Sequence, residues 1–130
     1  MIAFDTCVLV RFLVDDDPAQ AEIAQDLMHE NTVYLSNTVL LETEWVLRSR
    51  YRKSPAELLD FFRLLVEVEN VALEDIIRFE MALDWYATGA DFADAIHLAS
   101  CDEAEMHTFD RDFCKSAREN GATPSVQILR

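Results

Sequence analysis

Acidic side chains stand at four places where a short apolar run has just ended or a predicted helix has just begun. Asp5 and Asp110 each follow an apolar run, and Glu42 and Asp94 fall in the early turns of predicted helices. Carboxylates gathered in one place repel one another unless a cation offsets their charge. Ligands that are all oxygen favour a hard divalent cation, so this pattern predicts a Mg²⁺ or Mn²⁺ site.

A carboxylate site of this kind suits hydrolysis of a phosphodiester, because its metal orients the substrate, activates a water and stabilises the leaving oxygen. A structural interpretation is also open. Acids are common near helix N-termini, where they interact favourably with the helix dipole. With 25 Asp and Glu in the chain, some also fall at strand ends by chance. The residues alone leave both interpretations standing.

Three further side chains lie beside these acids, and each has two interpretations. Asp91 either extends the metal site or caps the helix that follows it, and the capping role is favoured. Asp112 either extends the site or caps the next short helix. His97, one turn after Asp94, either faces the site or is packed or bonded elsewhere.

The densest basic cluster comes just beyond Glu42 and comprises Arg48, Arg50, Arg52 and Lys53. Arg48 and Arg52 are candidates for contacts to the phosphates of such a substrate. The cluster could equally contact an acidic segment of a partner. A third interpretation is a solvated helix end, where positive charge is favourable to the dipole.

Strands and helices alternate along the chain, which predicts βα units and a mostly parallel sheet. We therefore expect an α/β fold of three layers, an α/β/α sandwich with about four to five strands, in a single domain over residues 1–130. The predicted strands are 1–4, 33–35, 106–109 and 125–129, with 71–73 as a connector or minimal strand, and the predicted helices are about 6–14, 18–29, 38–52, 55–68, 74–87, 92–102 and 111–119.

Helix boundaries carry the side chains that normally cap helices. The predicted caps are Asp5 or Thr6, Asp17 before Pro18, Ser36 or Asn37, and Ser54 with Glu57 in a capping box, and Gly89 is a predicted helix stop. The carboxyl ends of parallel strands form the ligand-binding edge of an open α/β sheet. Asp5, Glu42, Asp94 and Asp110 are therefore expected to converge there.

The composition limits the partners. The formal net charge is −14, from 25 acids against 11 Lys and Arg, which disfavours nucleic-acid binding through a general basic surface and favours metal cations or a basic protein. No apolar run approaches the roughly 18 residues of a membrane span, and no signal peptide is evident. The three cysteines form no metal or redox motif, so a reducing cytoplasm is expected.

Four stretches of the chain form a recognisable set: residues 2–6 (IAFDT), 35–42 (LSNTVLLE), 91–99 (DFADAIHLA) and 108–113 (TFDRDF). They resemble the motifs of the PIN-domain ribonucleases, in particular the VapC-like toxins of bacterial and archaeal toxin–antitoxin pairs. They occur in the family's order over nearly the whole chain.

The resemblance implies a PIN fold and endonucleolytic cleavage of RNA that depends on Mg²⁺ or Mn²⁺. It places the family's catalytic and metal-binding acids at Asp5, Glu42, Asp94 and Asp110. It gives Thr6 the role of holding a carboxylate or a water bound to the metal. The next position, often Asn or Ser in the family, is Cys7 here.

The resemblance also implies a cognate antitoxin. An antitoxin segment that reaches the acidic site should be basic, and a homodimer or a larger toxin–antitoxin assembly is expected. The apolar helix over 54–68, with Phe61 and Phe62, and the helix with Trp85 and Tyr86 are predicted to form the contact surface.

Two other functions are open to the chain. Phe4-Asp5-Thr6 could begin a phosphatase with a nucleophilic aspartate, but Cys7 occupies the place of the second acid which that chemistry needs. The chain could also be a PIN-fold interaction module without catalysis, although all four acids are present.

Overall fold

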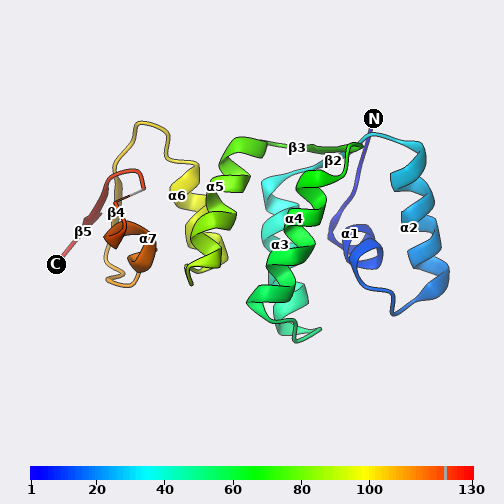
Figure 1. Cartoon of the computed structure of the whole chain (residues 1–130), viewed down its shortest axis with the longest axis horizontal. Helices are drawn as coiled ribbons and strands as arrows, with labels where there is room; N and C mark the ends of the chain where they lie inside the picture. The colour runs from blue at the N-terminus through cyan, green and yellow to red at the C-terminus, as the bar shows by residue number, and fades with distance from the viewer. Residues whose placement is uncertain (122) are drawn as a thin grey trace. The chain divides into compact units, whose positions relative to one another are not determined.

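The first half of the chain forms a small parallel sheet. The computed structural model describes residues 1–121 and 123–130, which group into two compact units, Met1–Asp75 and Ile76–Arg130. In the first unit, β1 (Ile2–Ala3), β2 (Val33–Leu35) and β3 (Val71–Leu73) pair in the order β1-β2-β3 (Figure 1). Ile2 lies opposite Val33, which lies opposite Val71. The carboxyl ends of all three strands therefore share one edge.

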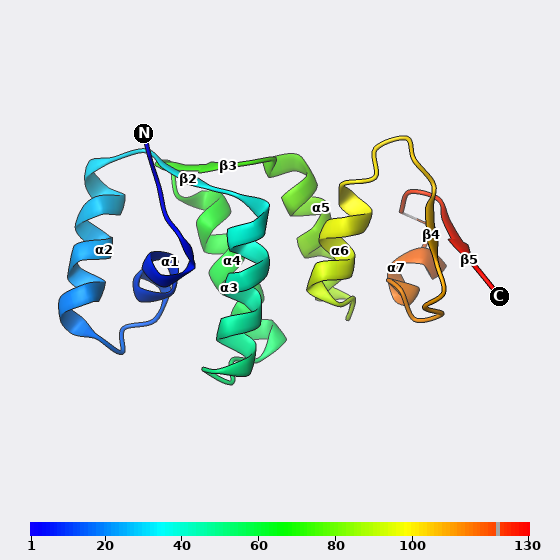
Figure 2. The same cartoon turned by 180° about the vertical axis from the view of Figure 1, so that it is seen from behind.

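Four helices accompany this sheet: α1 (Thr6–Leu13), α2 (Pro18–Glu30), α3 (Asn37–Ser49) and α4 (Pro55–Glu67). Helix α1 packs on α2 and α3, and α3 packs on α4. Figures 1 and 2 are drawn from opposite sides, and α4 lies in front of α3 in the first and behind it in the second. The side chains that fill this core with no exposed surface include Leu9, Leu35, Leu40, Leu47, Leu58, Phe62 and Leu65.

The helices of the first unit begin where the sequence predicts. Asp17 accepts a hydrogen bond from the Gln20 amide at 3.2 Å, and Ser36 accepts one from Val39 at 3.2 Å. Ser54 and Glu57 form the predicted capping box. Each cap satisfies an amide that lacks a partner within its helix.

The second unit contains α5 (Ile76–Ala87), α6 (Phe92–Ala99), β4 (Met106–Thr108), α7 (Lys115–Glu119) and β5 (Val126–Ile128). Strands β4 and β5 pair in parallel, and α5 packs on α6. Phe92 meets the edges of Phe79 and Tyr86, with ring centroids 6.4 and 5.4 Å apart. Gly89 adopts the predicted left-handed conformation (φ 105°) just after α5.

The α/β class and the parallel pairing of strands are confirmed. Within the described residues, three strands pair in the first unit and two in the second. The predicted single domain over 1–130 stays a prediction. No helix in these parts of the chain has the length and apolar character needed to cross a bilayer.

Three helix boundaries differ from the predictions, and a left-handed residue lies close to each of them. Helix α3 ends at Ser49, not near 52, where Arg52 has φ 54°. Helix α6 ends at Ala99, not near 102, where Asp102 has φ 55°. Helix α7 begins only after Cys114, whose φ is 47°. None of these residues is Gly, so their residue types did not predict a left-handed conformation at these positions.

The predicted contact surface on α4 and α5 needs correction. Phe62, Trp85 and Tyr86 are buried within the chain, as are Leu58 and Leu65. They fill its own interior and are unavailable to a partner. On α4, Leu64 is 48% exposed and Phe61 is half-buried, so only a narrow apolar strip remains.

Candidate functional site

Asp5 is fixed at the junction of β1 and α1. Its exposed carboxylate caps α1 by accepting the Val8 amide at 3.1 Å. Phe4 is buried, and its amide donates to the Tyr34 carbonyl at 3.3 Å, so the residue before the acid is anchored both to the core and to β2. The first acid therefore has a defined place at the sheet edge.

Glu42 and Thr6 line one cavity between α3 and α1. Glu42 is exposed, whereas Thr6 is buried. Among the described residues, the Thr6 hydroxyl has no hydrogen-bond partner, and neither has that of Thr43. A buried polar group without a partner costs stability. The Thr6 hydroxyl therefore leaves a hydrogen bond to be made by a ligand in the cavity that Glu42 also lines.

Glu74 is an acid at this edge that the sequence analysis missed. It directly follows β3 and accepts hydrogen bonds from the amide and the side-chain nitrogen of Asn37, both at 3.2 Å. It also accepts a bond from the Tyr34 hydroxyl at 3.4 Å. Desolvation and the Glu74 carboxylate raise the pKa of Tyr34. Glu74 thus fixes the start of α3, the helix that carries Glu42. Its position directly after the predicted strand 71–73 is the sequence feature that could have identified it as an acid of this edge.

In the second unit, Asp91, Asp94 and Asp110 lie close enough to influence one another. Asp91 is the N-cap of α6, as favoured from the sequence, and accepts the Asp94 amide at 3.1 Å. Partial burial, then the charges of Asp91 and Asp110, raise the pKa of Asp94, while His97 opposes this shift. These carboxylates form a concentrated negative site, with the exposed His97 near enough to affect it.

The loop after β4 presents Asp110. The Asp110 amide donates to the Thr108 hydroxyl at 3.0 Å, and the Asp112 amide donates to the Asp110 carboxylate at 2.9 Å. Arg118 fastens the same loop, because its Nε and Nη2 donate to the carbonyls of Phe113 and Arg111 at 2.6 and 2.7 Å. Asp112 is exposed, and it does not cap α7, since that helix begins at Lys115 with Cys114 at the N-cap.

Two of the cysteines differ sharply in their surroundings. Cys7 is exposed on α1. Cys114 is buried, and desolvation with the charge of Asp94 raises the pKa of its thiol to about 11. Cys114 therefore remains a neutral thiol beside the acids of the second unit.

The basic candidates have different surroundings. Arg48 forms a two-pronged ion pair with the buried Glu44, at 2.9 and 3.4 Å. Its charge is therefore largely offset. Arg52 is exposed after α3, and the Arg50 guanidinium lies over the Trp45 ring, 5.9 Å from its centroid.

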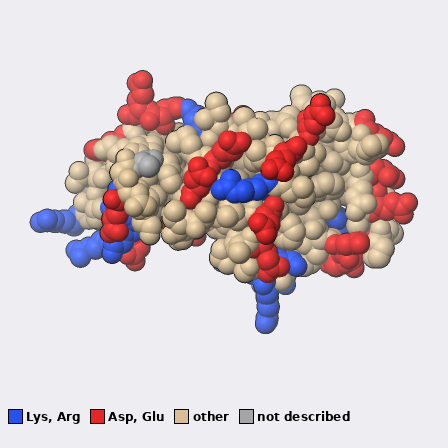
Figure 3. Space-filling model, in the orientation of Figure 1, with Lys and Arg blue, Asp and Glu red and all other residues tan. Residues whose placement is uncertain are grey.

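The four predicted acids are divided between the two units. Asp5 and Glu42 belong to the first, and Asp94 and Asp110 to the second. Within the residues that the structure describes, no group of three or more His, Cys, Asp or Glu is arranged to hold a metal ion. Acidic side chains recur over the face drawn in Figure 3, with fewer basic ones between them.

Comparison with known proteins identifies the family. The family model of the PIN domain matches residues 2–119, a stretch that includes all four acids. A search of curated proteins finds no match for the chain. The chain therefore belongs to the PIN-domain family, whose fold is of the nuclease type.

Proposed function

We propose that this PIN-domain protein is an RNA endonuclease that depends on Mg²⁺ or Mn²⁺ and acts as the toxin of a toxin–antitoxin pair. The observation that carries the proposal is the grouping of Asp91, Asp94 and Asp110, where partial burial and then the charges of Asp91 and Asp110 raise the pKa of Asp94. A bound divalent cation would offset the repulsion among these acidic side chains.

The proposed ligands have the chemical type that such a cation prefers. Asp5, Glu42, Asp94 and Asp110 offer carboxylate oxygens, the ligand type that Mg²⁺ and Mn²⁺ prefer. The buried Thr6 hydroxyl, which has no partner among the described residues, adds an oxygen beside Asp5 and Glu42. A metal held by these residues would polarise the phosphodiester and lower the pKa of a water.

The chain's own residues supply the positioning. The cap on α1 fixes Asp5, and Glu74 fixes the start of the helix that carries Glu42. Arg118 fastens the loop that presents Asp110. Rigid placement of this kind lowers the reorganisation needed when charge develops at the reacting phosphate.

Inhibition by a basic segment of an antitoxin belongs to the same proposal. An Arg or Lys placed among the carboxylates would offset their charge and compete with metal and substrate. The net charge of −14 favours a partner of this kind. A homodimer or larger assembly is proposed with it.

The test is a cleavage assay with purified protein free of partners. Single-stranded RNA should be cut internally with Mn²⁺ or Mg²⁺ and left intact with EDTA, and mapping of the cut ends would identify the sequence preference. DNA of the same sequence serves as the matched substrate. Equal cleavage with EDTA, or cleavage of the DNA alone, would contradict the proposal.

Variants at the acids separate chemistry from folding. Asp5→Asn, Glu42→Gln, Asp94→Asn and Asp110→Asn should each abolish cleavage that depends on metal. Asn still caps a helix well, so Asp5→Asn should keep α1 intact. Asp60→Asn, at an exposed position on α4, removes the same charge and should retain activity. An acid variant with full activity would remove that residue from the site.

A further inference from the structure

A cavity of about 340 Å³ lies between α1 and the end of α3, and we refer to it as the α1–α3 cavity. Its volume falls at the lower end of the range of small-ligand pockets, about 300–1,000 Å³. Glu42 lines it, so the cavity adjoins one of the proposed metal-binding acids. The other lining residues are Thr6, Cys7, Val10, Arg11, Trp45, Val46, Arg50 and Tyr51.

Trp45 gives the cavity an aromatic wall that solvent can reach. Half of this residue's surface is exposed (50%). It stands on α3 three residues after Glu42. An exposed indole offers a flat surface on which a base or another planar group can stack.

Arg50 places a positive charge against this wall. Its guanidinium carbon lies 5.9 Å from the centroid of the Trp45 ring, and no carboxylate within the described residues forms an ion pair with it. In a chain with 25 acids and 11 Lys and Arg, a cation left without such a partner is available for a ligand.

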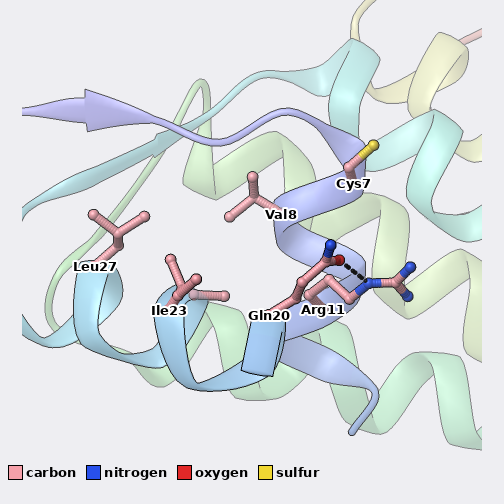
Figure 4. Close-up of a pocket in the computed structure, with 7 residues that line it drawn as sticks. Cys7, Val8, Arg11, Gln20, Ile23 and Leu27 are labelled. Atoms are coloured by element: carbon pink, nitrogen blue, oxygen red, sulfur yellow. Dashed lines mark hydrogen bonds between the residues drawn. The ribbon is translucent and has the colours of Figure 1, made fainter. Parts of the chain in front are cut away.

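Arg11 is the second cation of the cavity, and its position is fixed. Its Nη1 donates to Asp16 at 3.0 Å and to the Tyr51 hydroxyl at 2.9 Å, while Tyr51 donates to Asp16 at 2.9 Å. Figure 4 shows its Nε bonded to Gln20, at 2.7 Å, with the guanidinium end directed away from Ile23. This network holds the cavity wall in place, so Arg50 is the cation free to respond to a ligand.

We propose that the α1–α3 cavity binds one nucleotide of the RNA strand, adjacent to the phosphodiester that is cut. The base stacks on Trp45, and Arg50 contacts the phosphate of that nucleotide. The proposal rests on the proposed function and names a subsite for its substrate. It also moves the expected phosphate contact from Arg48, which is paired with Glu44, to Arg50.

The chemistry of the cavity favours a nucleotide over a protein segment. A nucleotide carries a planar base and an anionic phosphate. The cavity offers an aromatic face beside a cation that has no ion-pair partner among the described residues. A basic peptide would be repelled by Arg50, whose charge no carboxylate of the described residues offsets. An acidic peptide would satisfy Arg50 but would leave the Trp45 face without a matching group.

Binding can be measured by ¹⁹F NMR after incorporation of 5-fluorotryptophan. The chain has two tryptophans, the exposed Trp45 and the buried Trp85, so the full-length protein gives two signals, which Trp45→Phe assigns. The titrant is a short single-stranded oligoribonucleotide, with the Asp94→Asn variant used so that the strand stays intact. An abasic strand of the same length presents the same phosphates without bases.

The proposal requires the Trp45 signal to shift with the oligoribonucleotide, much less with the abasic strand, and the Trp85 signal to stay in place. An unmoved Trp45 signal at RNA concentrations that saturate the protein would overturn it. So would an equal shift with the abasic strand, or a shift caused only by an acidic peptide of matched charge.

Steady-state kinetics test the nucleotide subsite independently of NMR. Trp45→Ala should raise KM for RNA by about 5- to 150-fold, the range that corresponds to stacking of one base, with kcat little changed. Trp45→Phe keeps an aromatic ring and should leave KM close to that of the parent protein. Arg50→Ala should raise KM. The control Lys115→Ala removes an exposed charge of the other unit and should leave KM unchanged. Unchanged KM for both Trp45→Ala and Arg50→Ala would overturn the proposal.

The two proposals fail separately. If RNA is cut but the Trp45 signal and KM do not respond, the subsite is wrong and the nuclease stands. If RNA shifts the Trp45 signal but no metal supports cleavage, the proposed function is wrong and the nucleotide site stands.

Discussion

Asp91 allows the capping and metal-binding interpretations of an acidic residue to be separated by substitution. Its carboxylate accepts the Asp94 amide at 3.1 Å, and its charge helps to raise the pKa of Asp94. Asp91→Ala removes both the cap and the charge, whereas Asp91→Asn removes the charge and keeps an oxygen that can accept the same bond. The difference between the two variants therefore isolates the cap.

Loss of the helix cap sets the size of the expected difference in Tm between the two variants. Replacing an N-cap Asp by Ala typically destabilises a protein by about 1 kcal/mol, whereas Asn caps about as well as Asp. For a chain of this length, about 1 kcal/mol corresponds to a Tm change of about 3–5 °C. Without metal, Asp91→Asn should be as stable as the parent protein or more stable, because one carboxylate no longer repels Asp94. Asp91→Ala should melt about 3–5 °C below Asp91→Asn.

The assay is thermal unfolding at neutral pH with EDTA, followed by circular dichroism. Asp60→Asn is the control for loss of one negative charge at an exposed helical position of the other unit. If Asp91→Asn and Asp91→Ala melt together, the reasoning about the cap is refuted. Retained nuclease activity in Asp91→Asn would assign Asp91 to capping alone, and lost activity would add it to the metal ligands.

Three other outcomes are expected. The folded protein raises the pKa of Asp94 above its ordinary 3.8, so it favours the protonated side chain. The stability that this protonated form contributes is fully present below pH 3.8 and is lost as the pH rises through the raised pKa. Asp94→Asn should therefore flatten this part of a curve of Tm against pH. Mn²⁺ or Mg²⁺ at a hundredfold excess over Kd should stabilise the parent protein by about 2.7 kcal/mol, and an equal effect of monovalent salt at matched ionic strength would refute a specific site. Iodoacetamide at pH 8 should modify Cys7 readily and Cys114 only after unfolding, because Cys114 is buried and the pKa of its thiol is about 11. Mass spectrometry of digested peptides measures the labelling of both cysteines. Rapid labelling of Cys114 in the folded protein would contradict its buried position.

Helix starts were predictable because the signals that set them are local. Ser36 and Ser54 each bond to an amide three residues later, so the sequence displays both partners together. The capping role of Asp91 was open to the same argument. Helix ends were less predictable, since Arg52 and Asp102 adopt left-handed conformations that their residue types do not demand. Tertiary context sets such conformations.

The surroundings of the site were less accessible to sequence reasoning. Arg48 stood in a basic cluster, and only the folded chain reveals that it pairs with the buried Glu44. The hydrogen bonds that Asn37 donates to Glu74 join residues far apart in the chain, so no local sequence pattern predicts them. Whether the four acids hold one metal stays a prediction, because it concerns both units together.

The parallel sheet of the first unit has a consequence for the order of folding. Its strands have two or three residues each, and its pairs Ile2–Val33 and Val33–Val71 join segments that are separated by whole helices. Closing such long loops costs chain entropy before any ladder bond forms. Helices such as α3, with local hydrogen bonds, can form on a faster timescale. We therefore expect Asp5 to reach the sheet edge late, so that recovery of nuclease activity during refolding lags behind recovery of helical structure.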